Sequence, residues 1–170
     1  MSMQICVLTD SLIAGIAEWQ RAIDAEGFPL QISDDDPNRN LAARLREEET
    51  EISYDTHDFR ELEDTYANKK FGRDWTYAVA FTWSSDIPQA IASWMAATSY
   101  ARATHGVVFD EQEGKLLTPE EAVQIVREIE RDRPAMEAAV ESFVRQLSPK
   151  SPEAAAAIAA LMQRRSKQSG

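Results

Sequence analysis

The stretch that decides the fold is Trp75–Trp83, which reads WTYAVAFTW. Large side chains at the odd-numbered positions alternate with small ones at Thr76, Ala78, Ala80 and Thr82. Because successive side chains of a strand point to opposite faces, this pattern predicts a strand with one bulky face and one small face. Neither face carries a charge, so we expect both to be covered and the strand to be central in its sheet. The small face should allow a helix to approach closely.

A helix and a hairpin are expected after this strand. Ser85 or Asp86 is suited to cap the helix, and Gly106 marks its end. Residues 107–117 contain two short apolar runs around a polar turn with a glycine. This arrangement is typical of a β-hairpin.

The N-terminal residues predict a strand, a helix and a second strand. Residues 3–7 alternate apolar and polar side chains, and a helical pattern then runs from a cap at Asp10 or Ser11 to Gly27. Residues 28–32 are apolar enough for the second strand. If the two strands pair in parallel, the three elements form a βαβ unit.

The middle of the chain is less regular. Leu41 and Leu45 indicate a short polar helix, and Ile52 and Tyr54 indicate an exposed or edge strand. Residues 59–66 fit either one helical turn or a packed loop.

The C-terminal third predicts helices. Thr118-Pro119-Glu120-Glu121 is a capping box with proline at the first helical position, and Pro134 should kink or restart the helix. Ser151-Pro152-Glu153 begins a further, alanine-rich helix.

These elements predict an α+β fold. We expect a mixed, largely antiparallel sheet of about five strands, with helices packed on it and a helical C-terminal appendage. The predicted core domain covers residues 1–122 and the helical extension residues 123–170.

Length and composition favour one cytoplasmic globular unit. With 170 residues, of which 44% are hydrophobic, the chain can bury one sizeable core. The single cysteine, Cys6, cannot form an intrachain disulfide, which suits a reducing compartment. The sequence lacks a signal-peptide pattern and any long apolar window, so we expect no membrane association.

Negative charge is concentrated between Asp34 and Asp64. Twelve carboxylates lie there against four arginines, so this stretch supplies eight of the eleven excess negative charges. Such a surface repels nucleic acid and attracts a cationic partner. The alternative interpretation is a solubility feature, although dispersed charges would serve solubility equally well.

The sequence nominates candidate partner-binding residues from this stretch and from the end of the central strand. They are Asp34, Asp35, Asp36, Glu47, Glu48, Glu49, Asp55, Asp58, Glu61 and Trp83.

A catalytic, metal-binding or cofactor-binding set is not recognisable in the sequence. The chain has two histidines, His57 and His105, and the thiol of Cys6 is expected to be buried within a strand. A calcium-loop pattern begins at Asp34, but Arg39 and Leu45 occupy its two diagnostic positions. We therefore expect a protein that is not an enzyme and has no cofactor.

The segment Trp75–Ala122 resembles small bacterial immunity proteins, which are encoded beside secreted polymorphic toxins. The shared features are a Trp-rich strand, an Ala-rich helix ending ATSYARATHG, the hairpin VVFDEQEG and the motif LTPEEA. These features are structural, so the resemblance transfers no functional residue. It implies that the protein binds and neutralises a cognate toxin. The acidic composition separately suits a toxin with a basic active-site surface, and the expected cytoplasmic location suits a toxin that acts in the cytoplasm.

Two other functions remain open at this point. One is a non-catalytic ligand-sensing or scaffold domain that uses the aromatic side of the central strand. The other is a hydrolase built on a pair of carboxylates.

Overall fold

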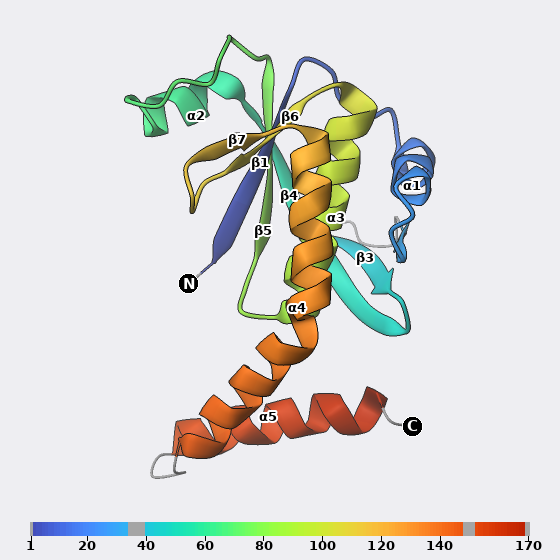
Figure 1. The fold of residues 1–170 in the computed structure, drawn as a ribbon, viewed down its shortest axis with the longest axis vertical. Coiled ribbons are helices and arrows are strands. Elements are labelled where there is room, and N and C mark those ends of the chain that lie inside the picture. Colours follow the sequence, from blue (N-terminus) through green and yellow to red (C-terminus); the bar gives the residue numbers. More distant parts are fainter. Residues whose placement is uncertain (1, 34–39, 148–151, 169–170) are drawn as a thin grey trace. The chain divides into compact units, whose positions relative to one another are not determined.

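The computed structural model describes residues 2–33, 40–147 and 152–168, which form seven strands and five helices (Figure 1). The strands are β1 Met3–Thr9, β2 Leu30–Ser33, β3 Asn40–Leu45, β4 Glu48–Asp58, β5 Tyr77–Trp83, β6 Val107–Asp110 and β7 Lys115–Leu117. The helices are α1 Ile16–Ala25, α2 Phe59–Thr65, α3 Ile87–Thr104, α4 Pro119–Gln146 and α5 Pro152–Gln168.

The described strands form one open sheet in the order β2-β3-β4-β5-β1-β6-β7, and every pairing is antiparallel. The α+β class and the central position of β5 are confirmed. The sheet has seven strands where about five were expected. The parallel βαβ unit is not formed, because β3, β4 and β5 separate β1 from β2.

Strand β3 was not expected, because its segment was misread. β3 was expected to be a short helix, because Leu41 and Leu45 are four residues apart. Ala43 is also buried, whereas Ala42 and Arg44 are exposed, so the true period is two. β4 is an interior strand of 11 residues between β3 and β5, and therefore not an edge strand.

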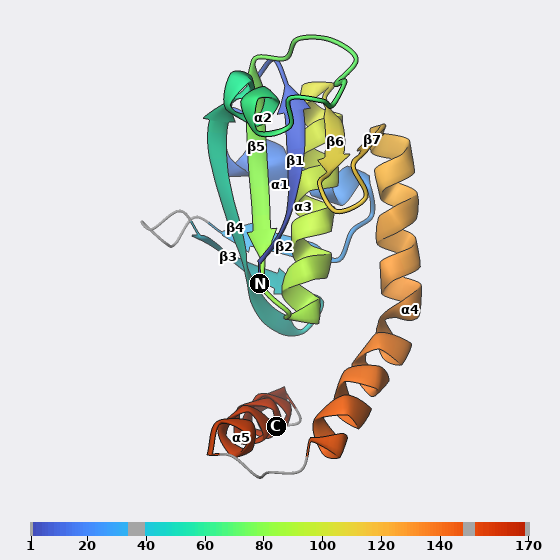
Figure 2. The same cartoon turned by 90° about the vertical axis from the view of Figure 1, so that its left-hand side faces the viewer.

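Helices α1 and α3 cover one face of the sheet (Figures 1 and 2). Val79, Phe81 and Trp83 of β5 point into this core. The helix that follows β5, α3, therefore packs on the bulky side of this strand, whereas α2 packs on its small side, at Ala78 and Ala80. Close approach comes from α3 itself, since its alanines, including Ala92 and Ala96, are fully buried.

Helix α2 and residues 66–76 cover one end of the opposite face. Phe59 and Leu62 of α2 and Phe71 pack on Cys6, Leu8, Ala78, Ala80 and Phe109 of the sheet. The open alternative for residues 59–66 is thus resolved as a helix, with Phe59–Thr65 as its bounds. The sheet has an apolar covering on this side over part of its area only.

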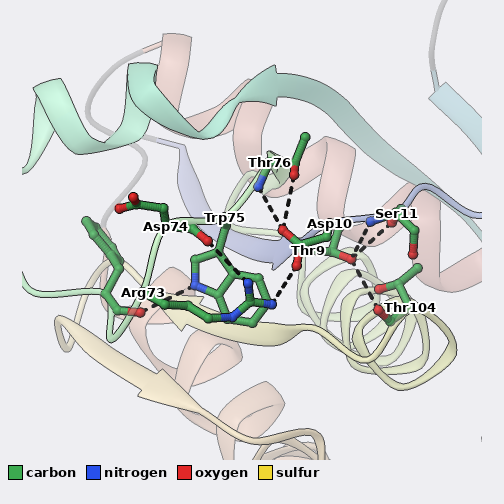
Figure 3. A network of polar contacts seen from close by, with 9 residues as sticks. Thr9, Asp10, Ser11, Arg73, Asp74, Trp75, Thr76 and Thr104 are labelled. Carbon is green, nitrogen blue, oxygen red and sulfur yellow. Dashed lines mark hydrogen bonds and ion pairs between the residues drawn. The ribbon is translucent and has the colours of Figure 1, made fainter.

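A polar network fastens residues 66–76 to the end of β1 (Figure 3). Asp10 accepts hydrogen bonds from the backbone N–H and Oγ1 of Thr76, each at 3.1 Å, and its Oδ2 lies 2.6 Å from Nη2 of Arg73. The Arg73 hydrogen bond holds the pKa of Asp10 below its ordinary value. The guanidinium carbon of Arg73 lies 3.7 Å from the ring centre of Trp75, which adds a cation–π contact.

The C-terminal end of α3 approaches β1 closely. His105 caps the helix in the left-handed region, with φ of 55°, and Gly106 follows. A Cβ atom on Gly106 would lie 2.4 Å from the carbonyl oxygen of Leu8. Glycine is therefore required at position 106 by space and not by its φ angle.

The chain divides into two compact units, Met1–Glu130 and Arg131–Gly170. Helix α4 is one helix with Pro134 inside it, so of the two expected alternatives, a kink or a restart, the restart does not occur. Val123 and Val126 of α4 are buried in the core of the first unit. The second unit contains the rest of α4 and α5.

Candidate functional site

The candidate site is the part of the second sheet face that α2 leaves open, which we call the uncovered face (Figure 2). Strand alternation and register assign to it Gln31, Ser33, Asn40, Ala42, Arg44, Glu49, Glu51, Ser53, Asp55, His57, Thr82 and Gln4. Antiparallel sheets often keep one face toward solvent, and that face is then polar. The alternate residues of the same strands, such as Leu41 and Ile52, point to the other face of the sheet and form the core.

A row of polar residues crosses four strands of this face. Asn40 of β3 is opposite Ser53 of β4, Ser53 is opposite Thr82 of β5, and Thr82 is opposite Gln4 of β1. Directly opposed residues of neighbouring strands share a face and lie about 4.5–5.5 Å apart at Cβ. The four side chains therefore form a continuous polar band.

The next row of cross-strand partners on this face has an alanine, Ala80, at its middle position. Asp55 of β4 is opposite Ala80 of β5, and Ala80 is opposite Cys6 of β1. The side chain of Ala80 is shorter than those of its neighbours, so an open hollow of about 370 Å³ forms over it. Its lining consists of Gln4, Asn40, Ser53, Tyr54, Asp55, His57, Ala80 and Thr82.

Carboxylates surround the imidazole at one side of the hollow. His57 Nε2 lies 3.8 Å from Oδ2 of Asp55, and its Nδ1 lies 3.4 Å from Oε2 of Glu61. All three side chains are about half exposed or more, so water screens these contacts strongly. Asp55 also accepts a hydrogen bond from the backbone N–H of Thr56, at 3.0 Å.

On the other side of the hollow, the carboxylate of Glu111 holds the Gln4 side chain. Its Oε1 accepts hydrogen bonds from Gln4 Nε2 at 2.7 Å and from the Cys6 thiol at 3.2 Å, and its Oε2 accepts one from the Tyr66 hydroxyl at 2.9 Å. Burial, followed by the charge of Glu111, raises the pKa of the Cys6 thiol far above its ordinary value. Burial, followed by the hydrogen bond to Glu111, raises the pKa of Tyr66 to about 12. The Cys6 thiol is thus poorly suited to act as a nucleophile.

Two further carboxylates lie along β4. Glu49 and Glu51 are exposed and, by alternation, share the face of Ser53 and Asp55, and Glu51 also accepts a hydrogen bond from Nε2 of Gln89 in α3, at 3.2 Å. Arg44 is opposite Glu49 on β3. The β4 side of the uncovered face is therefore acidic, while the β1 side becomes apolar toward α2.

The partner-binding residues that the sequence predicts do not lie together in one surface patch. Asp34, Asp35 and Asp36 lie outside the described residues. Glu47 is exposed in the turn between β3 and β4. Glu49 lies on the uncovered face, but Glu48 is on the opposite side of β4, so Glu47-Glu48-Glu49 do not form one patch.

The remaining candidates separate into two groups. Asp55 and Glu61 lie beside the hollow. Asp58 caps α2 by accepting a hydrogen bond from the N–H of Arg60, which gives it a structural role. Trp83 was expected at an accessible strand end, but it is 5% exposed in the core under α3 and offers no contact surface.

Sequence reasoning missed the polar band of Gln4, Asn40, Ser53 and Thr82. Alternation within β4 was a usable signal for Ser53, since Ile52 and Tyr54 flank it. The band as a whole depends on the register of four strands, which local patterns do not specify.

The described part of the chain contains no group of three or more histidine, cysteine or acidic side chains placed to hold a metal ion. None of the described helices combines the length and apolar character needed to cross a membrane. What the uncovered face offers is an array of carboxylate, amide and hydroxyl oxygens, which is chemistry for binding donors and cations.

No family model matches the chain, and searches of curated proteins and solved structures found no match.

Proposed function

We propose that this chain is a non-enzymatic binding protein of the immunity type, which neutralises a toxin by covering a basic surface of it. The observation that carries the proposal is the uncovered face, where Glu49, Glu51 and Asp55 share one side of β4. The resemblance of Trp75–Ala122 to immunity proteins supports the same role. We propose a cytoplasmic location with it, since the toxin would then be met where it acts.

Charge favours a basic partner. The formal net charge of −11 on 170 residues gives the chain a negative field at a distance, and the carboxylates of β4 concentrate it on one face. Such a field accelerates encounter with a cationic surface and slows it with an anionic one. Toxins that act on nucleic acid or phosphorylated cofactors need basic active-site surfaces, which fits this complementarity.

Contact chemistry supports a binding role over catalysis. Cys6 donates to Glu111 within the sheet and Asp58 caps α2, so both reactive-looking groups serve the fold. A polar sheet face with exposed hydroxyl, amide and carboxylate groups can make many hydrogen bonds to a protein surface.

The test is association with the product of a toxin-like reading frame beside the gene, measured at low and physiological salt. Reversing Glu49 and Glu51 to lysine should slow association by roughly tenfold or more and flatten its salt dependence. The matched control reverses Glu137 and Glu141, two exposed or half-exposed acidic residues of α4 in the second unit. Equal losses in both variants, or none in either, would contradict the proposal.

A ligand-sensing domain is the second candidate. The aromatic side of β5 no longer supports it, because that side is packed under α3. The hollow over Ala80 is the observation that favours it. Binding of a small molecule there with no protein partner would select this alternative.

A further inference from the structure

We propose that the hollow over Ala80 receives an arginine side chain of the partner protein. The inference rests on the proposed function and specifies what the uncovered face recognises. The occupant is a guanidinium group presented by a protein surface.

Ala80 lies at the base of the hollow, where its small side chain leaves room for a flat group. It is 5% exposed and sits between Asp55 on β4 and Cys6 on β1. Ser53 and Thr82 form the adjoining row, so the base of the hollow is bordered by oxygen-bearing side chains on two sides. A guanidinium is planar and is less strongly hydrated than an ammonium group, which suits it to a shallow site over a methyl group.

The border supplies acceptors for the N–H groups of the guest. Asp55 provides a carboxylate; its Oδ1 accepts from the Thr56 N–H and its Oδ2 lies 3.8 Å from His57 Nε2, and each oxygen has a second lone pair with which it can accept from a guanidinium. The hydroxyls of Ser53 and Thr82 can each accept a hydrogen bond. Gln4 Nε2 is held by Glu111, so the amide of Gln4 retains its Oε1 as the acceptor toward the hollow.

The surrounding charges select a cation. Asp55 lines the hollow, Glu61 lies on the far side of His57, and Glu111 stands behind Gln4. Arg44 is opposite Glu49, outside the lining of the hollow. A phosphate or carboxylate guest would therefore meet repulsion from several sides, whereas arginine carries five donors for the acceptors present.

The experiment is a titration of the full chain with N-acetyl-arginine amide, followed through backbone amide shifts in NMR spectra. We expect the largest shifts at Ser53, Ala80 and Thr82, with a dissociation constant in the millimolar range for a ligand of about 15 non-hydrogen atoms. N-acetyl-citrulline amide, which has the same shape without the charge, should bind at least about tenfold more weakly. N-acetyl-lysine amide should also bind more weakly, because it lacks the planar fork.

Variants of the chain test the assigned contacts. Asp55→Asn keeps an acceptor for the Thr56 N–H and should weaken arginine binding by about tenfold or more. Thr82→Val keeps the branched shape and should weaken it by a few-fold. Glu128→Gln, at an exposed acidic residue of α4 that does not line the hollow, is the control and should change binding less than about twofold. Retained amide shift dispersion confirms folding of each variant.

Several results would overturn the inference. These are equal binding of the arginine and citrulline compounds, shifts spread over all acidic residues, and Asp55→Asn binding that matches wild type. Different results would contradict the proposed function of the protein and the proposed arginine site. If a basic toxin still associates in a salt-dependent way while the arginine compound leaves Ser53, Ala80 and Thr82 unchanged, only the inference is wrong. If the arginine compound binds but reversal of Glu49 and Glu51 leaves association with the toxin unchanged, the proposed function is wrong.

Discussion

The Cys6 thiol donates a hydrogen bond to Oε1 of Glu111 at 3.2 Å, across the 105 residues that separate them in sequence. The carboxylate and the thiolate form of Cys6 would repel each other in this buried place. The protein is therefore built around the neutral thiol, with consequences for its stability at alkaline pH.

We predict that stability falls above about pH 9 in a way that depends on Cys6. A group whose pKa is raised by folding contributes stability that is present below its unfolded pKa and lost as pH rises through its folded pKa. The ordinary value for Cys6 is 9.0, so the free energy of unfolding should decline above it by at most about 1.4 kcal/mol per pH unit from this group. Denaturant unfolding of wild type and Cys6→Ala between pH 7 and 10.5 measures the difference. Parallel pH profiles would show that Cys6 contributes nothing.

Gly106→Ala should be strongly destabilising, by roughly 2–4 kcal/mol, because its Cβ would meet the Leu8 carbonyl at 2.4 Å. Gly15→Ala is the control, since no atom lies within 4 Å of the added Cβ and its φ of 177° is ordinary extended backbone. Thermal unfolding compares the two variants. A loss at Gly106 no larger than that at Gly15 would mean that α3 can shift away from β1.

Asp58→Ala removes the cap of α2 and should cost about 1 kcal/mol, whereas Asp58→Asn should cost only a few tenths. The reason is that asparagine retains an oxygen for the Arg60 N–H. Chemical denaturation provides both values. Similar losses for the two substitutions would indicate that charge at the helix start matters more than the hydrogen bond.

Arg73→Gln should loosen residues 66–76, because it weakens both the contact with Asp10 and the stacking on Trp75. We expect the amide of Thr76, which donates to Asp10, to exchange with solvent several-fold faster. Lys70→Gln removes an equal charge from the same exposed segment and should leave this exchange rate near the wild-type value. Unchanged exchange in Arg73→Gln would show that Phe71 packing alone holds the segment.

Truncation should separate the two units. A chain ending at Arg133 keeps Val123 and Val126 and should fold, with its unfolding free energy lowered by about 1 kcal/mol, since Met136 and Phe143 beyond the cut are exposed. A chain ending at Ala122 loses both buried valines and should be several kcal/mol less stable. Circular dichroism and thermal melts distinguish these outcomes. Failure of the longer chain to fold would show that the second unit completes the core.

The sequence specified those parts of the fold whose signals are local. The cap at Asp86, the capping box of Thr118 and Glu121, and the helix end at Gly27 each depend on a few adjacent residues, and the structure contains all three. The uncharged alternation of Trp75–Trp83 was equally local and correctly predicted a central strand.

Features that depend on distant partners were not predictable in the same way. The segment containing Leu41 and Leu45 fits a helical period as well as a strand period, and only pairing with β2 and β4 decides between them. The clustering of acidic residues was visible, but the side of β4 on which each one lies was not. Trp83 was misplaced because its position at a strand end suggested exposure, whereas α3 covers it.

The residues that the fold requires and the residues proposed to bind a partner lie on different faces of the sheet. Residues such as Ile52 and Phe81 are constrained by the packing of the opposite face, while Glu49, Ser53 and Thr82 can change with little effect on that packing. Exposed substitutions usually cost within about 0.5 kcal/mol. Under the proposed function, substitutions at these positions could change which partner is bound while the packing of the core stays the same.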